Sequence, residues 1–240
     1  MTALVALFAI GVRATPALAQ DREDDRLAKR AQRAGEVLAE LVSVPDRSPP
    51  KSLLAKATCV AVVPHVIQAG LGFGGRVGYG LVSCRTPGGW SRPSFVGLKG
   101  GSFGLQIGGQ AADIVLVFVN RNAPATTASS SFDLGGEASV AAGPLGRNAS
   151  AETDYKLDAE IYSYSKSKGL FAGIKIAGTK WEIDYDANRR MYAAAPEGMR
   201  GEDAKSVARL LTTPAEGAPQ ALAPFLTSLE QHVGAGVTRK

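Results

Sequence analysis

Side chains that commonly do catalytic chemistry are scarce in this chain. It has two histidines, His65 and His232, and two cysteines, Cys59 and Cys84. A Ser-His-Asp site would depend on His65 alone, because His232 falls in a proline-containing tail. A nucleophilic Cys59 paired with His65 would need an activated free thiolate. We therefore predict a protein without catalytic residues, and we keep a hydrolase as the weakest alternative.

One run of carboxylates has part of a metal-binding pattern. Asp184-x-Asp186-x-Asn188 begins like a calcium loop, but the sixth position is Arg189 instead of Gly and the twelfth is Ala195 instead of Glu. An Asp/Asn turn that links strands is the ordinary interpretation of these residues. The sequence therefore predicts no metal ion.

The glycine-rich stretch could in principle cradle a phosphate. Gly70-Leu71-Gly72-Phe73-Gly74-Gly75 satisfies G-x-G-x-x-G. A dinucleotide site needs a helix directly after that motif, whereas here a strand-like segment with Gly78 and Gly80 follows. Glycines spaced along strands instead mark bends and close backbone approach. We predict no cofactor and a strongly curved or barrel-like sheet.

Basic side chains gather in two places where they could hold an anion. In residues 24–44, apolar residues recur every three or four positions, which predicts a helix whose opposite face is basic. Near residue 165, aromatic and basic residues alternate as on one face of a strand. A solvated strand end before Gly169 explains the second pattern as well. The candidate lipid-binding residues are Arg26, Lys29, Arg30, Arg33, Lys166 and Lys168.

The net charge of the chain and its N-terminal residues limit the classes of partner that we expect. A net charge of +5 favours phospholipid headgroups, nucleic acid or anionic glycans. The first residues, MTALVALFAIGVRATPALAQ, combine a short apolar run with an A-x-A cleavage site, although no basic residue precedes the run. We predict a signal peptide over residues 1–19, and a periplasmic or secreted protein that associates peripherally with a membrane. Export makes nucleic acid an unexpected partner.

The two cysteines fall in predicted strands. An even pair in an exported chain is often bridged, so we predict a Cys59–Cys84 disulfide if the Cα atoms lie about 4.4–6.8 Å apart. Two buried free thiols are the alternative.

The order of elements predicts an α+β fold. A helix over 24–44 and a short helix after Ser48 precede strands over 58–64, 76–84, 94–110 and 113–120. More strands follow from 135 to 185, then a closing helix over 203–211 and a loose tail with one helical stretch around 225–232. Because strands and helices do not alternate, we expect antiparallel, strongly curved or barrel-like sheets with N-terminal helices and a closing C-terminal helix.

Five blocks of the sequence, in this order, resemble the SYLF domain family. The blocks are Gly70–Gly80, Gly89–Pro93, Gly100–Gln110, Gly135–Arg147 and Tyr162–Gly173. The similarity runs from about Leu27 to Met199, so we divide the chain into a SYLF-like domain over 20–199 and a helix with a proline-containing tail over 200–240.

The resemblance implies a lipid-binding module, with phosphoinositides as ligands in eukaryotes and actin as a partner in fungal relatives. We expect anionic phospholipids or a membrane surface as the partner, and no actin, because an exported chain does not meet a cytoskeleton. An envelope structural protein that binds another protein or a glycan is the alternative.

Overall fold

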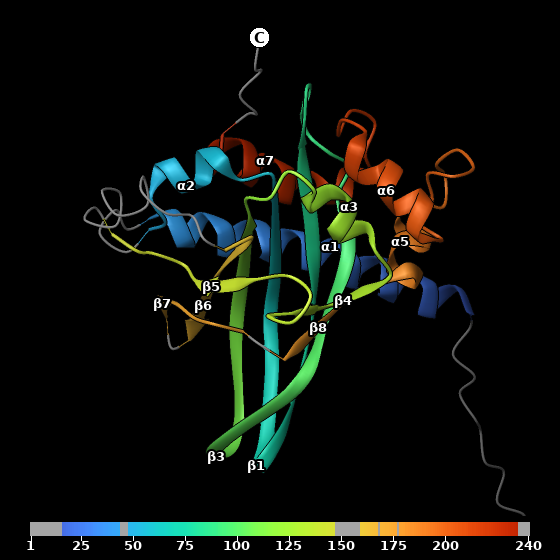
Figure 1. The fold of residues 1–240 in the computed structure, drawn as a ribbon. Coiled ribbons are helices and arrows are strands. Elements are labelled where there is room, and N and C mark those ends of the chain that lie inside the picture. Colours follow the sequence, from blue (N-terminus) through green and yellow to red (C-terminus); the bar gives the residue numbers. More distant parts are fainter. Residues whose placement is uncertain (1–15, 44–47, 147–158, 168, 177, 235–240) are drawn as a thin grey trace, which may run out of the picture.

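A computed structural model shows two very long strands surrounded by helices and shorter strands (Figure 1). It describes residues 16–43, 48–146, 159–167, 169–176 and 178–234, with only the backbone for 16–19, 70–73 and 102–109. Strand β1 (Cys59–Thr86) has 28 residues and β3 (Ser94–Phe118) has 25. Strands of about 5–6 residues are usual, so these two dominate the architecture.

β1 and β3 form one two-stranded ribbon, the β1–β3 ribbon, that bends back on itself. They pair antiparallel from Cys59↔Phe118 to Val82↔Ser94, with register shifts between Val63 and Val66 and between Leu71 and Gly72. The glycine-rich middle of both strands lies at the bend (Figure 1). We had predicted four separate strands here. The structure joins them in pairs, because glycine lets the backbone bend without interrupting the ladder.

The two halves of β1 come into direct contact above the bend. A Cβ atom added at Gly80 would lie 2.1 Å from the carbonyl oxygen of Val62 and 2.6 Å from the Cα of Val63. The backbone N–H of Arg85 donates to the carbonyl of Thr58 at 2.7 Å. Only glycine therefore fits at position 80.

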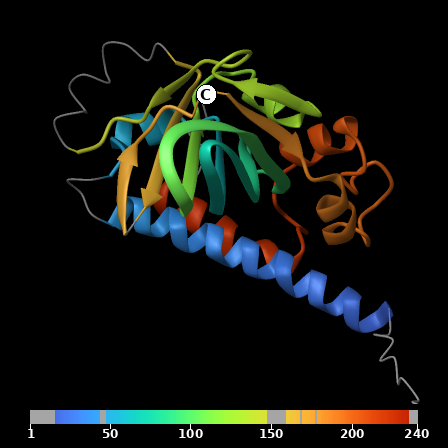
Figure 2. The same ribbon diagram turned by 90° about the horizontal axis from the view of Figure 1, so that it is seen from below.

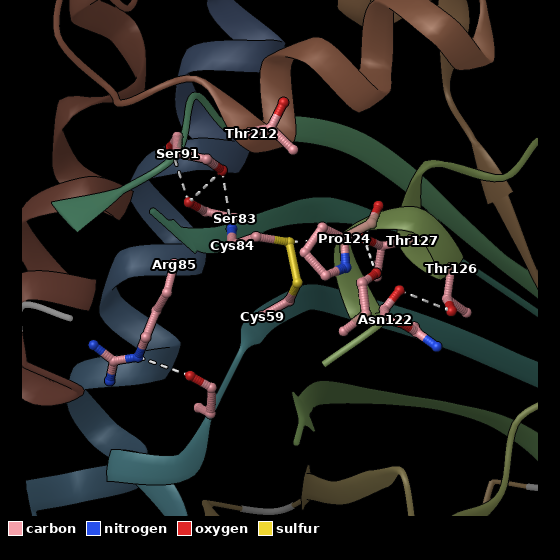
Figure 3. Close-up of a disulfide and its surroundings, with 12 residues drawn as sticks. Cys59, Ser83, Cys84, Arg85, Ser91, Asn122, Pro124, Thr126, Thr127 and Thr212 are labelled. Atoms are coloured by element: carbon pink, nitrogen blue, oxygen red, sulfur yellow. Dashed lines mark hydrogen bonds between the residues drawn. A yellow bond between two sulfur atoms is a disulfide. The ribbon is translucent and has the colours of Figure 1, made fainter. Parts of the chain in front are cut away.

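A disulfide bond joins Cys59 and Cys84 at this contact (Figure 3). The Cα atoms are 3.9 Å apart, closer than the expected window, because the two halves of β1 touch through their backbones. Both cysteines are fully buried. Ser91 lies beside the bond: its hydroxyl accepts from the Cys84 N–H at 2.9 Å.

Shorter strands extend the ribbon on both sides into a curled half-barrel (Figure 2). β8 (Thr179–Ile183) pairs with β4 (Ser131–Leu134) and with the first part of β3, and β6 (Ile161–Ser167) pairs with the last part of β3. β7 (Leu170–Gly173) continues from β6, and β2 (Gly89–Trp90) pairs with β1. The pairing is antiparallel except between β6 and β5 (Val140–Ala142). The predicted fold class is confirmed.

Helix α1 (Pro16–Ser43) runs along one side of the curled sheet (Figure 2). Its apolar stripe, including Leu27, Leu38 and Leu41, is buried, as its periodicity predicts. The remaining helical elements are α2 (Lys51–Lys56), α3 (Ala123–Ala128), α5 (Tyr185–Met191), α6 (Ala204–Thr212), the 3-10 helix η2 (Gln220–Leu222) and α7 (Ala223–His232). None of the helices in the described residues is both long and apolar enough to cross a bilayer.

The C-terminal segment packs against α1. Phe225 and Leu229 of α7 are fully buried, and the hydroxyl of Ser228 donates to the carbonyl of Gly35 at 2.7 Å. Gly35 allows this approach, because an added Cβ would lie 2.6 Å from the carbonyl oxygen of Pro224.

The sequence predicts a helical stretch around 225–232, which α7 matches, within a loose tail. The described part of the tail is instead packed and shares the core of the domain. Its three prolines suggest an irregular segment, but Pro219 and Pro224 lie at the starts of η2 and α7, and Pro214 forms a β-bridge with Ser91.

Candidate anion-binding surface

Two of the predicted basic residues are exposed on α1. The side chains of Arg26 and Lys29 are 74% and 71% accessible, and they pair with Glu23 and Asp25 of the same helix at 3.2 and 2.6 Å. Exposed pairs of this spacing contribute only about 0.3–0.5 kcal/mol. An external anion can therefore compete for both cations.

Arg30 has turned inward. Its guanidinium lies 3.3 Å from the Asp184 carboxylate and 5.3 Å from the centroid of the Tyr79 ring. Asp184 also accepts from the Ala187 N–H at 3.1 Å and so caps α5. Arg30 thus holds α1 against β1 and α5.

Arg33 and Lys166 converge on a small pocket, although they are 133 positions apart in the sequence. Arg33 lies 3.1 Å from Asp113 and 3.4 Å from Glu40, and the Lys166 ammonium also contacts Glu40. The pocket has a volume of about 260 Å³. We call it the Arg33–Lys166 pocket; it is lined by Arg33, His65, Ala111, Ala112, Asp113, Lys166 and Gly169.

His65 lies at the rim of this pocket in an unusual backbone conformation. Its φ is 52°, in a region that residues other than glycine rarely adopt. The conformation falls in the β1 irregularity between Val63 and Val66, and the His65 N–H donates to Asp113 at 2.9 Å. Within the described residues the His65 ring has no hydrogen-bonded carboxylate, so the arrangement is not that of a catalytic triad.

The serine motif of a hydrolase fails its structural test as well. Gly100-Gly101-Ser102-Phe103-Gly104 has the spacing G-x-S-x-G, which in hydrolases forms a strand-to-helix turn. Here the segment is continuous β3 backbone, with Ser102 opposite Gly74 of β1. It therefore belongs to the ribbon and makes no nucleophile elbow.

Glu40 organises the charges of the pocket. The hydrogen bond from Lys166 lowers the pKa of Glu40, against the opposing effect of burial, and Arg33 lowers it further. Burial alone would lower the pKa of Arg33, but Glu36, Asp113 and Glu40 together raise it. Both groups are thus held in their charged forms at neutral pH.

Replacing Glu40 should reduce the acid sensitivity of the fold. Because the folded-state pKa of Glu40 is depressed, its contribution is present above the unfolded pKa and is lost as the pH falls through the folded one. We expect Glu40→Gln to lower the free energy of unfolding by about 1 kcal/mol at pH 7, and by less near pH 3. Urea unfolding at both pH values checks this. Glu36→Gln, which removes an exposed partner of Arg33, is the control; an equal loss there would contradict the role of Glu40.

A second, larger pocket of about 520 Å³ lies between β1, β3, β8 and α5. Its two cations are already paired, Lys99 with Glu182 at 2.6 Å and Arg189 with Asp186, and Asp184 pairs with Arg30. Glu202 also lines the pocket and adds a negative charge, and its Oε2 is buried without a hydrogen-bond partner among the described residues. Among the described residues no group of three His, Cys, Asp or Glu side chains could hold a metal ion. This pocket therefore offers less to an anion than the Arg33–Lys166 pocket.

No pattern in the sequence indicated the acidic residues of the Arg33–Lys166 pocket. Glu40 and Asp113 could not be identified as partners of Arg33, because their proximity depends on how α1 crosses the sheet. Lys168 and residues 1–15 lie outside the described residues, so that lysine and the signal peptide remain predictions.

The chain belongs to the Ysc84 family, which contains the SYLF domain. The family model, described as "Las17-binding protein actin regulator", matches residues 99–231. The SH3 domain-containing YSC84-like protein 1 of Xenopus laevis is 36% identical over 173 residues, which cover 69% of this chain and 51% of that protein. LAS seventeen-binding protein 3 of Saccharomyces cerevisiae is 33% identical over 175 residues, covering 69% and 38%. The chain thus spans about half or less of the relatives it matches.

This family membership corrects our expectation about actin. We had excluded actin as a partner because the sequence predicts export. The family is described as an actin regulator, and a yeast relative is named for binding Las17. That exclusion was wrong: it rested on a predicted location and not on any property of the fold.

Proposed function

We propose that this protein is a non-catalytic module that binds anionic lipid headgroups at a membrane surface. The observation that carries the proposal is the convergence of Arg33 and Lys166 on one small pocket, on the same α1 face as the exposed Arg26 and Lys29. Headgroup phosphates are small enough for such a pocket, and they favour several convergent donors.

The carboxylates around the Arg33–Lys166 pocket do not use all the N–H donors of Arg33 and Lys166. An ammonium group has three N–H donors and a guanidinium has five. Lys166 contacts Glu40, and Arg33 pairs through its terminal nitrogens with Glu36, Glu40 and Asp113. The carboxylates keep both cations in place, and the remaining N–H groups can bind a phosphate oxygen.

Long-range attraction would come from the chain as a whole. The pocket itself is close to neutral, but the net charge of the chain is +5. Each Lys or Arg near an anionic bilayer contributes about 1 kcal/mol, and salt screens this contribution. Binding should therefore depend on both lipid charge and ionic strength.

Vesicle sedimentation tests the proposal. We expect the purified chain to bind vesicles that contain phosphatidylserine and to release them at high salt. Lys166→Gln should weaken binding about fivefold, the equivalent of one cation. Lys56→Gln, which removes an exposed lysine from α2, should leave binding unchanged. Binding that is indifferent to lipid charge and salt, or equal losses in both variants, would overturn the proposal.

A protein partner is the second candidate, and the family description favours it. The matching region, residues 99–231, runs from β3 to α7, and a yeast relative is named for binding Las17. A Las17-like protein is therefore the partner we would test. A binding assay with a purified Las17-type protein, with and without actin filaments, tests this. Sequencing the N-terminus of the protein isolated from cells would show whether the predicted cleavage before Gln20 occurs, and so in which compartment it meets a partner.

A further inference from the structure

The tip of the β1–β3 ribbon extends away from the helices and carries no charged residue (Figure 1). Residues 69–75 and 100–112 contain no Asp, Glu, Lys or Arg, although such residues make up 20% of the chain. Protruding segments in water are normally rich in charged side chains, because these are the residues least often buried. The composition of the tip therefore indicates that it meets something other than water.

Large hydrophobic side chains are exposed on the same ribbon. Ile67, Tyr79 and Val77 are 47%, 42% and 39% accessible. Val77 and Tyr79 lie on one face of β1, because side chains two apart share a face of a strand. Ile67 lies in the other half of β1, beyond the register shift at Leu71 and Gly72. Its neighbour Val66 faces Gly78, so Ile67 points outward from that other half of the ribbon. In the described part of the chain only one other large hydrophobic residue, Leu170, is exposed to this degree. Exposed apolar side chains on both halves of the ribbon mark a contact surface.

Basic residues lie where the ribbon joins the body of the domain. Lys99 is opposite Val77 in β1 and opposite Lys180 in β8. Arg76 donates to the hydroxyl of Thr179 at 3.1 Å. Glu182 pairs with Lys99 and offsets one of these three positive charges. An apolar element bordered by cations is typical of proteins that insert into the surface of an anionic bilayer.

We propose that the β1–β3 ribbon inserts its tip into an anionic lipid surface, with Arg76, Lys99 and Lys180 at the headgroups. Tyr79 lies two residues beyond Val77 toward the body of the domain, opposite Gly97, and aromatic rings with a polar end are favoured at the membrane interface. A second copy of the chain fits less well, because a symmetric contact would bring like charges together. A ribbon two strands wide also offers much less than the roughly 800 Å² per partner of a stable interface. This inference rests on the proposed lipid-binding function.

The backbone limits the depth of insertion. Residues 101–112 of β3 pair only with β1, so one edge of the ribbon has unpaired N–H and C=O groups. Such groups are costly in hydrocarbon, which open sheet edges do not cross. The tip should therefore remain at the level of the headgroups and upper acyl chains.

Tryptophan probes test insertion directly. The native Trp90 and Trp181 are fully buried and give a constant background. We expect the emission of Val77→Trp to shift to the blue on vesicles with phosphatidylserine, and to be quenched by bromine on the upper acyl chain. Lys56→Trp on α2, at the opposite end of the molecule, should show neither change (Figure 1). Wild-type protein with the same vesicles provides the binding curve.

A serine variant measures what the exposed apolar side chains of the ribbon contribute to vesicle binding. Ile67→Ser combined with Val77→Ser should weaken vesicle binding roughly tenfold, because two partly buried aliphatic side chains lose their apolar contact. Leu170→Ser removes exposed apolar surface outside the ribbon and should change binding less than twofold. Circular dichroism spectra that match the wild type would show that the variants are folded.

The outcomes separate this inference from the proposed function. If wild-type protein binds no vesicle, the proposed function fails and this inference fails with it. If wild-type protein binds with the expected salt dependence but Val77→Trp is not quenched, or the serine variant binds normally, only the ribbon inference is overturned. A blue shift of Val77→Trp that depends on protein concentration without vesicles would also overturn it, in favour of self-association.

Discussion

Reduction of the Cys59–Cys84 disulfide should lower the free energy of unfolding by about 3 kcal/mol. The bond closes a loop with a sequence separation of 25 and so restricts the unfolded chain. It also joins the two halves of β1 where the ribbon has bent back (Figure 3). Few single changes in a domain of this size have a larger effect. Urea unfolding with and without a thiol reductant measures the difference.

A double variant, Cys59→Ala with Cys84→Ala, separates the bond from the reductant. We expect it to have nearly the stability of the reduced wild-type protein and not to respond to the reductant. Both side chains are fully buried, so each substitution adds a modest packing loss. If reduction leaves the unfolding midpoint of the wild type unchanged, the bond does not stabilise the ribbon.

Gly80→Ala should destabilise the domain by about 3 kcal/mol or prevent folding. The added methyl group would overlap the backbone of Val62 and Val63, which cannot turn aside as a flexible side chain would. Overpacking of a buried site costs about 1–3 kcal/mol, and more where the obstacle is rigid. The free energy of unfolding in urea, compared with the wild type, gives the magnitude.

Gly75→Ala is the matched control in the same strand. A Cβ atom at Gly75 would meet nothing within 4 Å. Alanine also reduces the freedom of the unfolded chain, so stability should be unchanged or higher by up to about 1 kcal/mol. Equal losses at both positions would mean that the ribbon needs glycine for its bend generally and not for the contact at Val62.

The glycines of β1 show which features of the fold can be predicted from the sequence and which cannot. Their number and spacing predicted a strongly curved sheet, and the G-x-G-x-x-G motif was correctly predicted to lead into a strand and not a helix. The structure extends that strand through Gly75, which lies opposite Gly101. The sequence could not distinguish a glycine in open space, such as Gly75, from one pressed against backbone, such as Gly80. That distinction depends on which half of β1 returns to which, and this is set by contacts between residues distant along the chain.

The basic residues show the same limit. Periodicity placed Arg26, Lys29, Arg30 and Arg33 on one face of a helix, and that face borders the buried stripe. It gave the four residues one role, whereas the structure divides them. Arg26 and Lys29 are exposed, Arg30 anchors α1 to Tyr79 and Asp184, and Arg33 meets Lys166.

The sequence by itself determined the amphipathic helix, the glycine-rich strands, the family and the absence of charge at the tip of the ribbon. These are properties of composition and local period, which a residue carries wherever the chain goes. Only the tertiary structure decided that the ribbon folds onto itself, that Glu40 and Asp113 hold Arg33, and that the C-terminal helix completes the core. Each of these joins segments far apart in sequence, and such contacts form because burial of the whole core favours them and not because of any short pattern.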